Sequence, residues 1–196
     1  MIVSPATIQI QWQEELRSKF NLDFIRMDRN AAEAALREYG ADANPWSTFP
    51  HIITSMDYLR QPAVLEQFKA ATTAMYRGDS GVLPWDLLIV DEAHNFTPNR
   101  FHDDSQRTQM LREISAHFEH RIFLTATPHN GFTVSFTGLL ELLDPVRFQQ
   151  KAELSTGDQK QIRVVMVRRL KSELNARSVR PRFAKRRVKA LQVDLT

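Results

Sequence analysis

Two adjacent carboxylates end a run of apolar residues. Asp91 and Glu92 follow residues 87–90 and precede Ala93-His94. In open parallel α/β sheets, ligands bind beyond the carboxyl ends of the strands, so both side chains lie where a site is expected. Magnesium prefers oxygen ligands and keeps several waters when it is bound to a nucleotide, so one carboxylate near a magnesium triphosphate is chemically sensible, and Asp91 fits that role. Glu92 can accept a proton from an attacking water, as phosphoryl transfer to water requires.

A second apolar run ends in hydroxyl groups. Residues 122–124 lead into Thr125-Ala126-Thr127-Pro128, so both hydroxyls are expected at the same edge of the sheet as the carboxylates. There they can form hydrogen bonds with His94 or with the carboxylates and respond to a bound phosphate. Taken alone, the acidic pair also fits a solvated turn, and the threonines also fit ordinary strand-end capping. The occurrence of both in one chain favours a joint site.

The elements that must position these residues form an α/β pattern. Segments with apolar residues every three or four positions alternate with five predicted strands, at residues 2–3, 24–27, 51–54, 87–90 and 122–125. This alternation predicts a parallel sheet with helices on both faces. The last two strands lack an apolar/polar alternation, which is typical of strands covered on both faces. We therefore expect both in the interior of the sheet.

Four apolar stripes at helical spacing are predicted to face the core. They are Ile8, Trp12, Leu16 and Phe20; Val64, Phe68, Ala71 and Met75; Met110, Leu111, Ile114 and Phe118; and Phe132, Phe136, Leu139, Leu140 and Leu143. Ser4-Pro5 precedes the first stripe and fits an N-cap with proline at the first helical position.

Composition and charge exclude several classes of protein. The 196 residues contain no cysteine, which excludes a disulfide framework and a cysteine nucleophile. No apolar run approaches the roughly 20 residues of a membrane span, and the N-terminus lacks a signal-peptide pattern, so we expect no membrane partner and a cytoplasmic protein. Residues 1–162 carry 15 Lys and Arg against 21 Asp and Glu (−6), whereas residues 163–196 carry 11 against 2 (+9). This basic segment fits either a polyanion such as nucleic acid or a solvated arm.

Five segments in order resemble a known family. Asp91-Glu92-Ala93-His94 and Thr125-Ala126-Thr127-Pro128 resemble motifs II and III of superfamily-two helicases, particularly Swi/Snf-type double-stranded DNA translocases. Residues 3–5 with 11–16 resemble motif Ia, residues 52–55 resemble the next DNA-contacting motif, and residues 167–174 resemble the exit from the first RecA-like lobe. Residues 185–196 look like the crossing toward a second lobe, and residues 127–131 with 139–145 most resemble bacterial members, including those of phage defence.

This resemblance implies a RecA-like P-loop NTPase lobe that uses ATP and Mg²⁺. Asp91 would hold Mg²⁺ through water and Glu92 would activate the hydrolytic water, while His94, Thr125 and Thr127 would couple the nucleotide state to the grip on DNA. The predicted DNA-binding residues are Ser4, Pro5, Thr54, Ser55, Arg168, Arg169 and Lys171. Contacts of this kind to phosphates of double-stranded DNA are largely independent of sequence and weaken as salt rises.

The phosphate-binding loop of such an ATPase is not found in the chain. That loop has the pattern G-x-x-x-x-G-K-[ST], and none of the six glycines is followed by lysine. We therefore expect a fragment. Residues 1–160 would be a partial first RecA-like lobe from motif Ia to motif III, and residues 161–196 a basic exit segment toward a missing second lobe. Alone, the fragment should be nearly inactive, bind no cofactor and expose a sheet edge that favours association.

Two alternatives use the same residues differently. A non-catalytic module derived from a helicase lobe could hold DNA or a protein through the basic segment and the loops at the sheet edge. A metal nuclease could use Asp91 and Glu92, although it needs more clustered carboxylates than the sequence contains. The sequence does not predict the biological pathway, the protein partners or the oligomeric state, and the resemblance implies a nucleoid-associated location.

Overall fold

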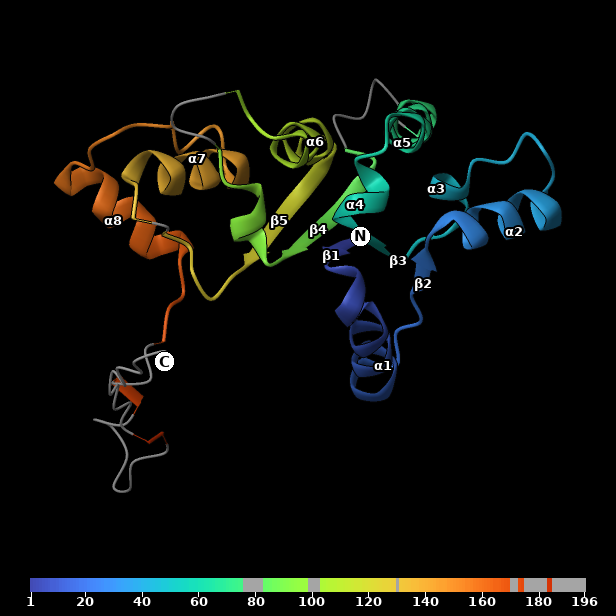
Figure 1. Cartoon of the computed structure of the whole chain (residues 1–196), viewed down its shortest axis with the longest axis horizontal. Helices are drawn as coiled ribbons and strands as arrows, with labels where there is room; N and C mark the ends of the chain where they lie inside the picture. Colours follow the sequence, from blue (N-terminus) through green and yellow to red (C-terminus); the bar gives the residue numbers. More distant parts are fainter. Residues whose placement is uncertain (76–82, 99–102, 130, 170–172, 175–182, 185–196) are drawn as a thin grey trace, which may run out of the picture. The chain divides into compact units, whose positions relative to one another are not determined.

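The computed structural model describes residues 1–75, 83–98, 103–129, 131–169, 173–174 and 183–184 (Figure 1). The chain divides into two compact units, Met1–Glu153 and Leu154–Thr196. The second unit contains helix α8 (Thr156–Val165), which begins at a capping box in which Ser155 and Asp158 exchange hydrogen bonds. No helix among these described residues is long and apolar enough to cross a membrane.

A parallel sheet of five strands organises the first unit. Its strands are β1 (Ile2–Ser4), β2 (Ile25–Met27), β3 (Ile52–Ser55), β4 (Trp85–Asp91) and β5 (Phe118–Leu124). They lie in the order β2-β3-β1-β4-β5, and every neighbouring pair is parallel. All five predicted strands are confirmed, although β4 and β5 begin earlier than their apolar runs. This architecture is that of an α/β RecA-like lobe.

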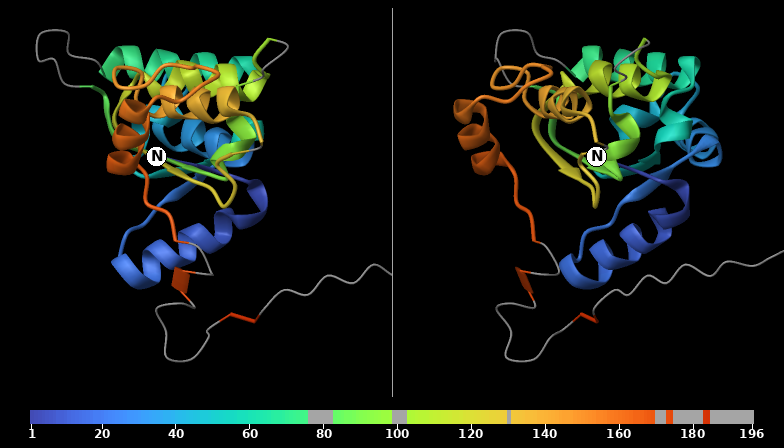
Figure 2. Two further views of the ribbon diagram at one scale, coloured as in Figure 1. Left: turned by 90° about the vertical axis from the view of Figure 1, so that its left-hand side faces the viewer. Right: turned by 60° about the vertical axis from the view of Figure 1, so that its left-hand side comes forward.

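Helices cover both faces of this sheet. In chain order they are η1 (Ala6–Ile8), α1 (Gln9–Phe20), α2 (Arg29–Tyr39), α3 (Pro45–Thr48), α4 (Met56–Leu59), α5 (Pro62–Met75), η2 (Ala93–Phe96), α6 (Gln106–Ser115) and α7 (Thr133–Leu143). Figure 2 shows α5, α6 and α7 on one side of the sheet and α1 on the opposite side. The prediction of helices on both faces is therefore confirmed.

The core is packed between the sheet and the helices α5 and α6. Phe68 of α5 is fully buried, and its ring stacks on Trp85 and Phe118 with centroids 5.8 Å and 6.3 Å apart. The edge of Phe68 also meets Trp46 at 5.5 Å. Phe118 was predicted as the last member of a helical stripe, but it begins β5 because α6 ends at Ser115. Aromatic packing thus ties α5 to both long strands.

The first apolar stripe does not face the core, and this prediction was wrong. Trp12 and Leu16 of α1 are only partly buried, and Phe20 is 67% exposed. Helix α1 packs against β2 and β3, and the side that carries this stripe borders a pocket that Asp91 also lines. Ser4 is not an N-cap either, because it ends β1 and its hydroxyl donates to the Pro5 carbonyl.

Strand β5 lies at an edge of the described sheet, which corrects its predicted interior position. Within the described residues it pairs only with β4, and its apolar side chains Ile122 and Leu124 are 45% and 37% exposed. The composition of β5 is thus that of a covered strand, although nothing described here covers one of its faces. Edges of this type pair readily with other strands, and the association of the chain that the sequence predicts stays a prediction.

Replacing Phe68 by alanine should lower the free energy of unfolding by about 3–5 kcal/mol, because it leaves a cavity between α5 and the sheet. The matched change Phe20→Ala should alter it by no more than about 0.5 kcal/mol, because that ring is mostly in water. Urea denaturation of the two variants measures both values. Similar losses would contradict the assignment of Phe68 to the core and of Phe20 to the surface.

Candidate functional site

The parallel register brings the ends of four strands to one edge of the sheet. Ser4 at the end of β1 pairs with Ser55 at the end of β3. Asp91 at the end of β4 lies opposite Leu124, so Thr125 follows directly at the same edge. This arrangement agrees with the sequence prediction that the carboxylates and the threonines meet. It creates a candidate site at the carboxyl ends of the strands, where ligands of open α/β sheets bind.

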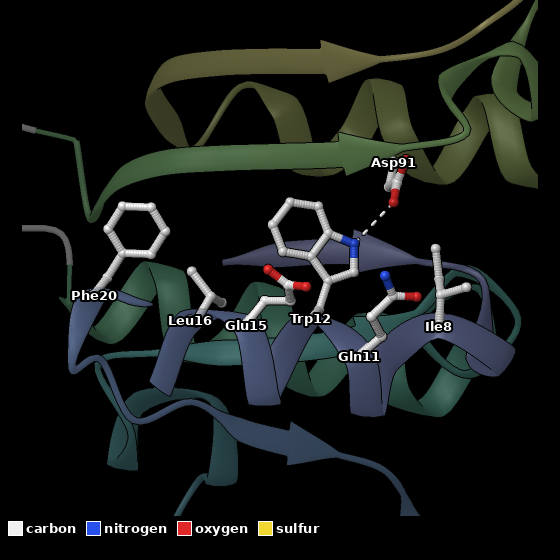
Figure 3. Close-up of a pocket in the computed structure, with 7 residues that line it drawn as sticks. All are labelled: Ile8, Gln11, Trp12, Glu15, Leu16, Phe20 and Asp91. Atoms are coloured by element: carbon white, nitrogen blue, oxygen red, sulfur yellow. Dashed lines mark hydrogen bonds between the residues drawn. The ribbon is translucent and has the colours of Figure 1, made fainter. Parts of the chain in front are cut away.

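Two N–H donors fix the carboxylate of Asp91. The backbone N–H of Glu92 donates to Oδ1 across 2.8 Å. The indole Nε1–H of Trp12 donates to Oδ2, also across 2.8 Å (Figure 3). Each oxygen therefore keeps a free lone pair. The sequence did not predict the indole bond, because Trp12 lies 79 positions from Asp91 and was interpreted as a core residue.

Glu92 has a left-handed backbone. Its φ of 52° and ψ of 46° lie in a region that costs a residue with a side chain about 1–2 kcal/mol. The carbonyl of Glu92 accepts hydrogen bonds from the backbone N–H and the side-chain amide of Asn95, at 2.9 Å and 3.0 Å. These bonds hold the tight turn from β4 into η2. Such strain clusters at functional sites, and it strengthens the assignment of this turn as the site.

His94 connects Glu92 to the neighbouring strand end. Its Nδ1 lies 3.2 Å from Oε2 of Glu92 and 3.1 Å from Oγ1 of Thr125. The same Thr125 oxygen accepts the backbone N–H of Thr127 at 3.1 Å. Glu92, His94 and Thr125 therefore form one polar group across the ends of β4 and β5. Thr127 is exposed and joins this group through its backbone.

The residues predicted to contact DNA near β1 and β3 differ in accessibility. Ser4 and Thr54 are fully buried, and the Thr54 hydroxyl donates to the Met27 carbonyl. Pro5 and Ser55 are partly exposed, and the hydroxyl of Ser55 accepts the Tyr58 N–H as the N-cap of α4. Any phosphate contact from this region must therefore use Pro5, Ser55 or nearby backbone groups. The DNA contacts of all four residues stay a prediction.

Ion pairs anchor the short helix that follows Ser55. Asp57 of α4 accepts hydrogen bonds from Arg107 of α6 at 2.9 Å and from Arg60 at 3.1 Å. The Arg107 bond, with a smaller contribution from Arg60, holds the pKa of the Asp57 carboxyl below its ordinary value. The position of Ser55 at the sheet edge is thus tied to α6.

The basic residues of the second unit are only partly described. Arg168 and Arg169 are exposed, and the Arg169 guanidinium donates to the Arg168 carbonyl at 3.1 Å. Lys171 lies outside the described residues, as do the seven basic side chains between positions 177 and 189. The DNA contacts of Arg168, Arg169 and Lys171 stay a prediction.

The donor atoms at the end of β4 fit magnesium bound through water. Among the residues that the structure describes, no group of three or more His, Cys, Asp and Glu side chains could hold a metal ion. Asp91 offers two carboxylate oxygens, each with one lone pair free. Magnesium retains several waters and often takes only one or two protein carboxylates beside substrate phosphates. Asp91 therefore suits this ion in the water-mediated mode that the resemblance implies.

Comparison with known proteins agrees with this geometry. The family model of the SNF2-related domain matches residues 1–195. The RNA polymerase-associated protein RapA of Yersinia pestis (strain Pestoides F) and that of Yersinia pseudotuberculosis serotype O:1b (strain IP 31758) are each 33% identical over 161 residues. The match covers 82% of this chain and 15% of either relative. Because the family match covers nearly the whole sequence, the chain belongs to the SNF2-related family of helicase-like ATPases.

Proposed function

We propose that this chain is part of an ATP-dependent Snf2-type translocase that couples ATP hydrolysis to movement on double-stranded DNA. The observation that carries the proposal is the polar group of Glu92, His94 and Thr125 across the ends of β4 and β5, directly beside Asp91. Glu92, whose carboxylate can accept a proton, is thus adjacent to Asp91, whose carboxylate can hold a metal ion through water. Membership of the SNF2-related family supports the same function.

Each residue of the site has a defined task in this proposal. Glu92 takes the proton of the attacking water, and its Oε2 lies 3.2 Å from Nδ1 of His94. Asp91 would hold magnesium through water, and the ion, when bound, supplies charge neutralisation of the phosphates. His94 and Thr125 link the catalytic carboxylate to β5. A change at either strand end is therefore transmitted to Glu92.

Contacts to DNA are proposed at the same edge of the sheet and in the second unit. Pro5 and Ser55 are accessible at the ends of β1 and β3, and Arg168 and Arg169 are exposed after α8. Such groups suit phosphate oxygens of double-stranded DNA, with affinity that falls as salt rises. The name of the RapA relatives adds RNA polymerase as a protein partner to be tested by co-purification.

We further propose that ATP turnover belongs to a longer protein that contains these residues. The chain has no Gly-Lys pair for a phosphate-binding loop, and it spans about 15% of the length of the RapA relatives. The resemblance places an arginine finger in a second lobe, and an arginine finger is worth roughly 10³–10⁵ in rate. The rival function is a non-catalytic DNA- or protein-binding module, which the missing phosphate loop favours.

Glu92→Gln in the longer protein should abolish ATP turnover and leave DNA binding intact, because the amide cannot accept the proton of the water. Phosphate release in the presence of double-stranded DNA measures turnover, and fluorescence anisotropy of a labelled duplex measures binding. The matched control is Glu153→Gln, an exposed residue outside these motifs, and it should keep turnover. If the protein with Glu92 intact binds DNA but hydrolyses no ATP, the binding module is the correct function.

Glu92→Gly should make the 196-residue chain more stable than Glu92→Ala by about 1 kcal/mol, because both variants lose the carboxylate and only glycine adopts a positive φ without strain. Equilibrium denaturation in urea compares the two variants directly. Equal stability of the two variants would show that the turn after β4 is unstrained. Backbone strain would then no longer support the assignment of this turn as the site.

A further inference from the structure

Trp12 of α1 forms a hydrogen bond with Asp91, the carboxylate that is proposed to hold magnesium. It lines a pocket of about 330 Å³ on the side of α1 that faces β4 (Figure 3). The other lining residues are Ile8, Gln11, Glu15, Leu16, Phe20 and Asp91. Figure 3 shows that Asp91 is the residue of this set that comes from β4, and that the nitrogen of the Trp12 indole is turned toward it. The indole is therefore the polar connection between α1 and the end of β4.

The hydrogen bond from Trp12 helps to fix the orientation of the Asp91 carboxylate. An indole Nε1 can only donate, and a bond to an ionised oxygen is stronger than one between neutral groups. With Glu92 N–H on Oδ1 and Trp12 on Oδ2, both oxygens are fixed and the plane of the carboxylate is defined. The free lone pairs then have set directions, which suits a carboxylate that would hold a metal ion through water.

Helix α1 also begins close to a predicted DNA contact. Residues 5–8 connect β1 to α1 through the short helix η1, so Pro5 and Trp12 lie within two turns of one another in the chain. The backbone bond from Glu92 is local to the turn, whereas the bond from Trp12 comes from the segment that follows β1. Of these two bonds, only the one from Trp12 can transmit a displacement of α1 to Asp91.

We propose that Trp12 is a positioning residue that orients the Asp91 carboxylate for magnesium and couples it to α1. The inference rests on the proposed function of Asp91, and it concerns the N–H group of Trp12 rather than the bulk of its ring. Outer partners of metal-binding carboxylates typically contribute 10- to 100-fold in metal affinity. Loss of this one N–H should therefore weaken metal binding by about tenfold.

The test uses the ¹⁵N-labelled 196-residue chain and Mn²⁺ as a paramagnetic probe for the magnesium position. A nearby Mn²⁺ ion broadens the amide signal of Glu92 even when binding is weak. We expect Asp91→Asn to abolish this broadening and Trp12→Phe to raise the Mn²⁺ concentration for half-broadening about tenfold. Leu16 lines the same pocket. The control variant Leu16→Ala keeps the indole of Trp12, so it should bind Mn²⁺ like the wild-type chain.

A second measurement needs no metal and keeps Trp12 in place. The chain has three tryptophans, and Trp12→Phe identifies the indole N–H signal of Trp12. Asp91→Ala should shift that signal upfield and leave the signals of Trp46 and Trp85 unchanged. An unshifted Trp12 signal, or equal Mn²⁺ binding by Trp12→Phe and the wild-type chain, would overturn the proposal. ATP turnover of the longer protein is independent of these readouts, so failure of the proposed function is recognised separately.

Discussion

The parallel register of the sheet is the constraint on which the rest of the structure depends. Because every strand pair is parallel, all the strands end at the same edge, and residues from four sequence segments meet there. Asp91 and Glu92 would be an ordinary acidic turn without Thr125 beside them. The core between α5, α6 and the sheet holds this register through the rings of Phe68, Trp85 and Phe118. The stacked rings of Trp85 and Phe118 and the candidate site thus lie at opposite ends of β4 and β5.

The turn after β4 combines a left-handed backbone with residues of the candidate site. Its left-handed Glu92 sharply reverses the chain, and this conformation leaves the Glu92 side chain free to meet His94. The same backbone N–H of Glu92 fixes one oxygen of Asp91. A strained residue costs free energy that the surrounding hydrogen bonds must offset. The turn therefore depends on Asn95 and on the packing of the fully buried Phe96 for its shape.

The sequence predicts the strands and the polar edge well, because apolar runs and the residues that end them are local signals. The sequence does not predict features that depend on contacts between residues far apart along the chain. The stripe of Trp12 and Phe20 has helical spacing, but spacing alone does not show whether another element covers that side. Strand β5 likewise has the composition of a strand covered on both faces, and no local signal shows that one of its faces is exposed. The bond from Trp12 to Asp91 joins residues 79 positions apart and has no local signature.

If the ends of β4 and β5 form one site, the hydroxyl of Thr125 must carry the response of ATP turnover to DNA. The most direct measurement is the ratio of turnover with and without double-stranded DNA in the longer protein, for Thr125→Ala beside Thr125→Ser. We expect alanine to lower the ratio at least about fivefold, the lower range of typical coupling between sites, and serine to preserve it because it keeps the hydroxyl. An unchanged ratio in Thr125→Ala would contradict a single site at this edge.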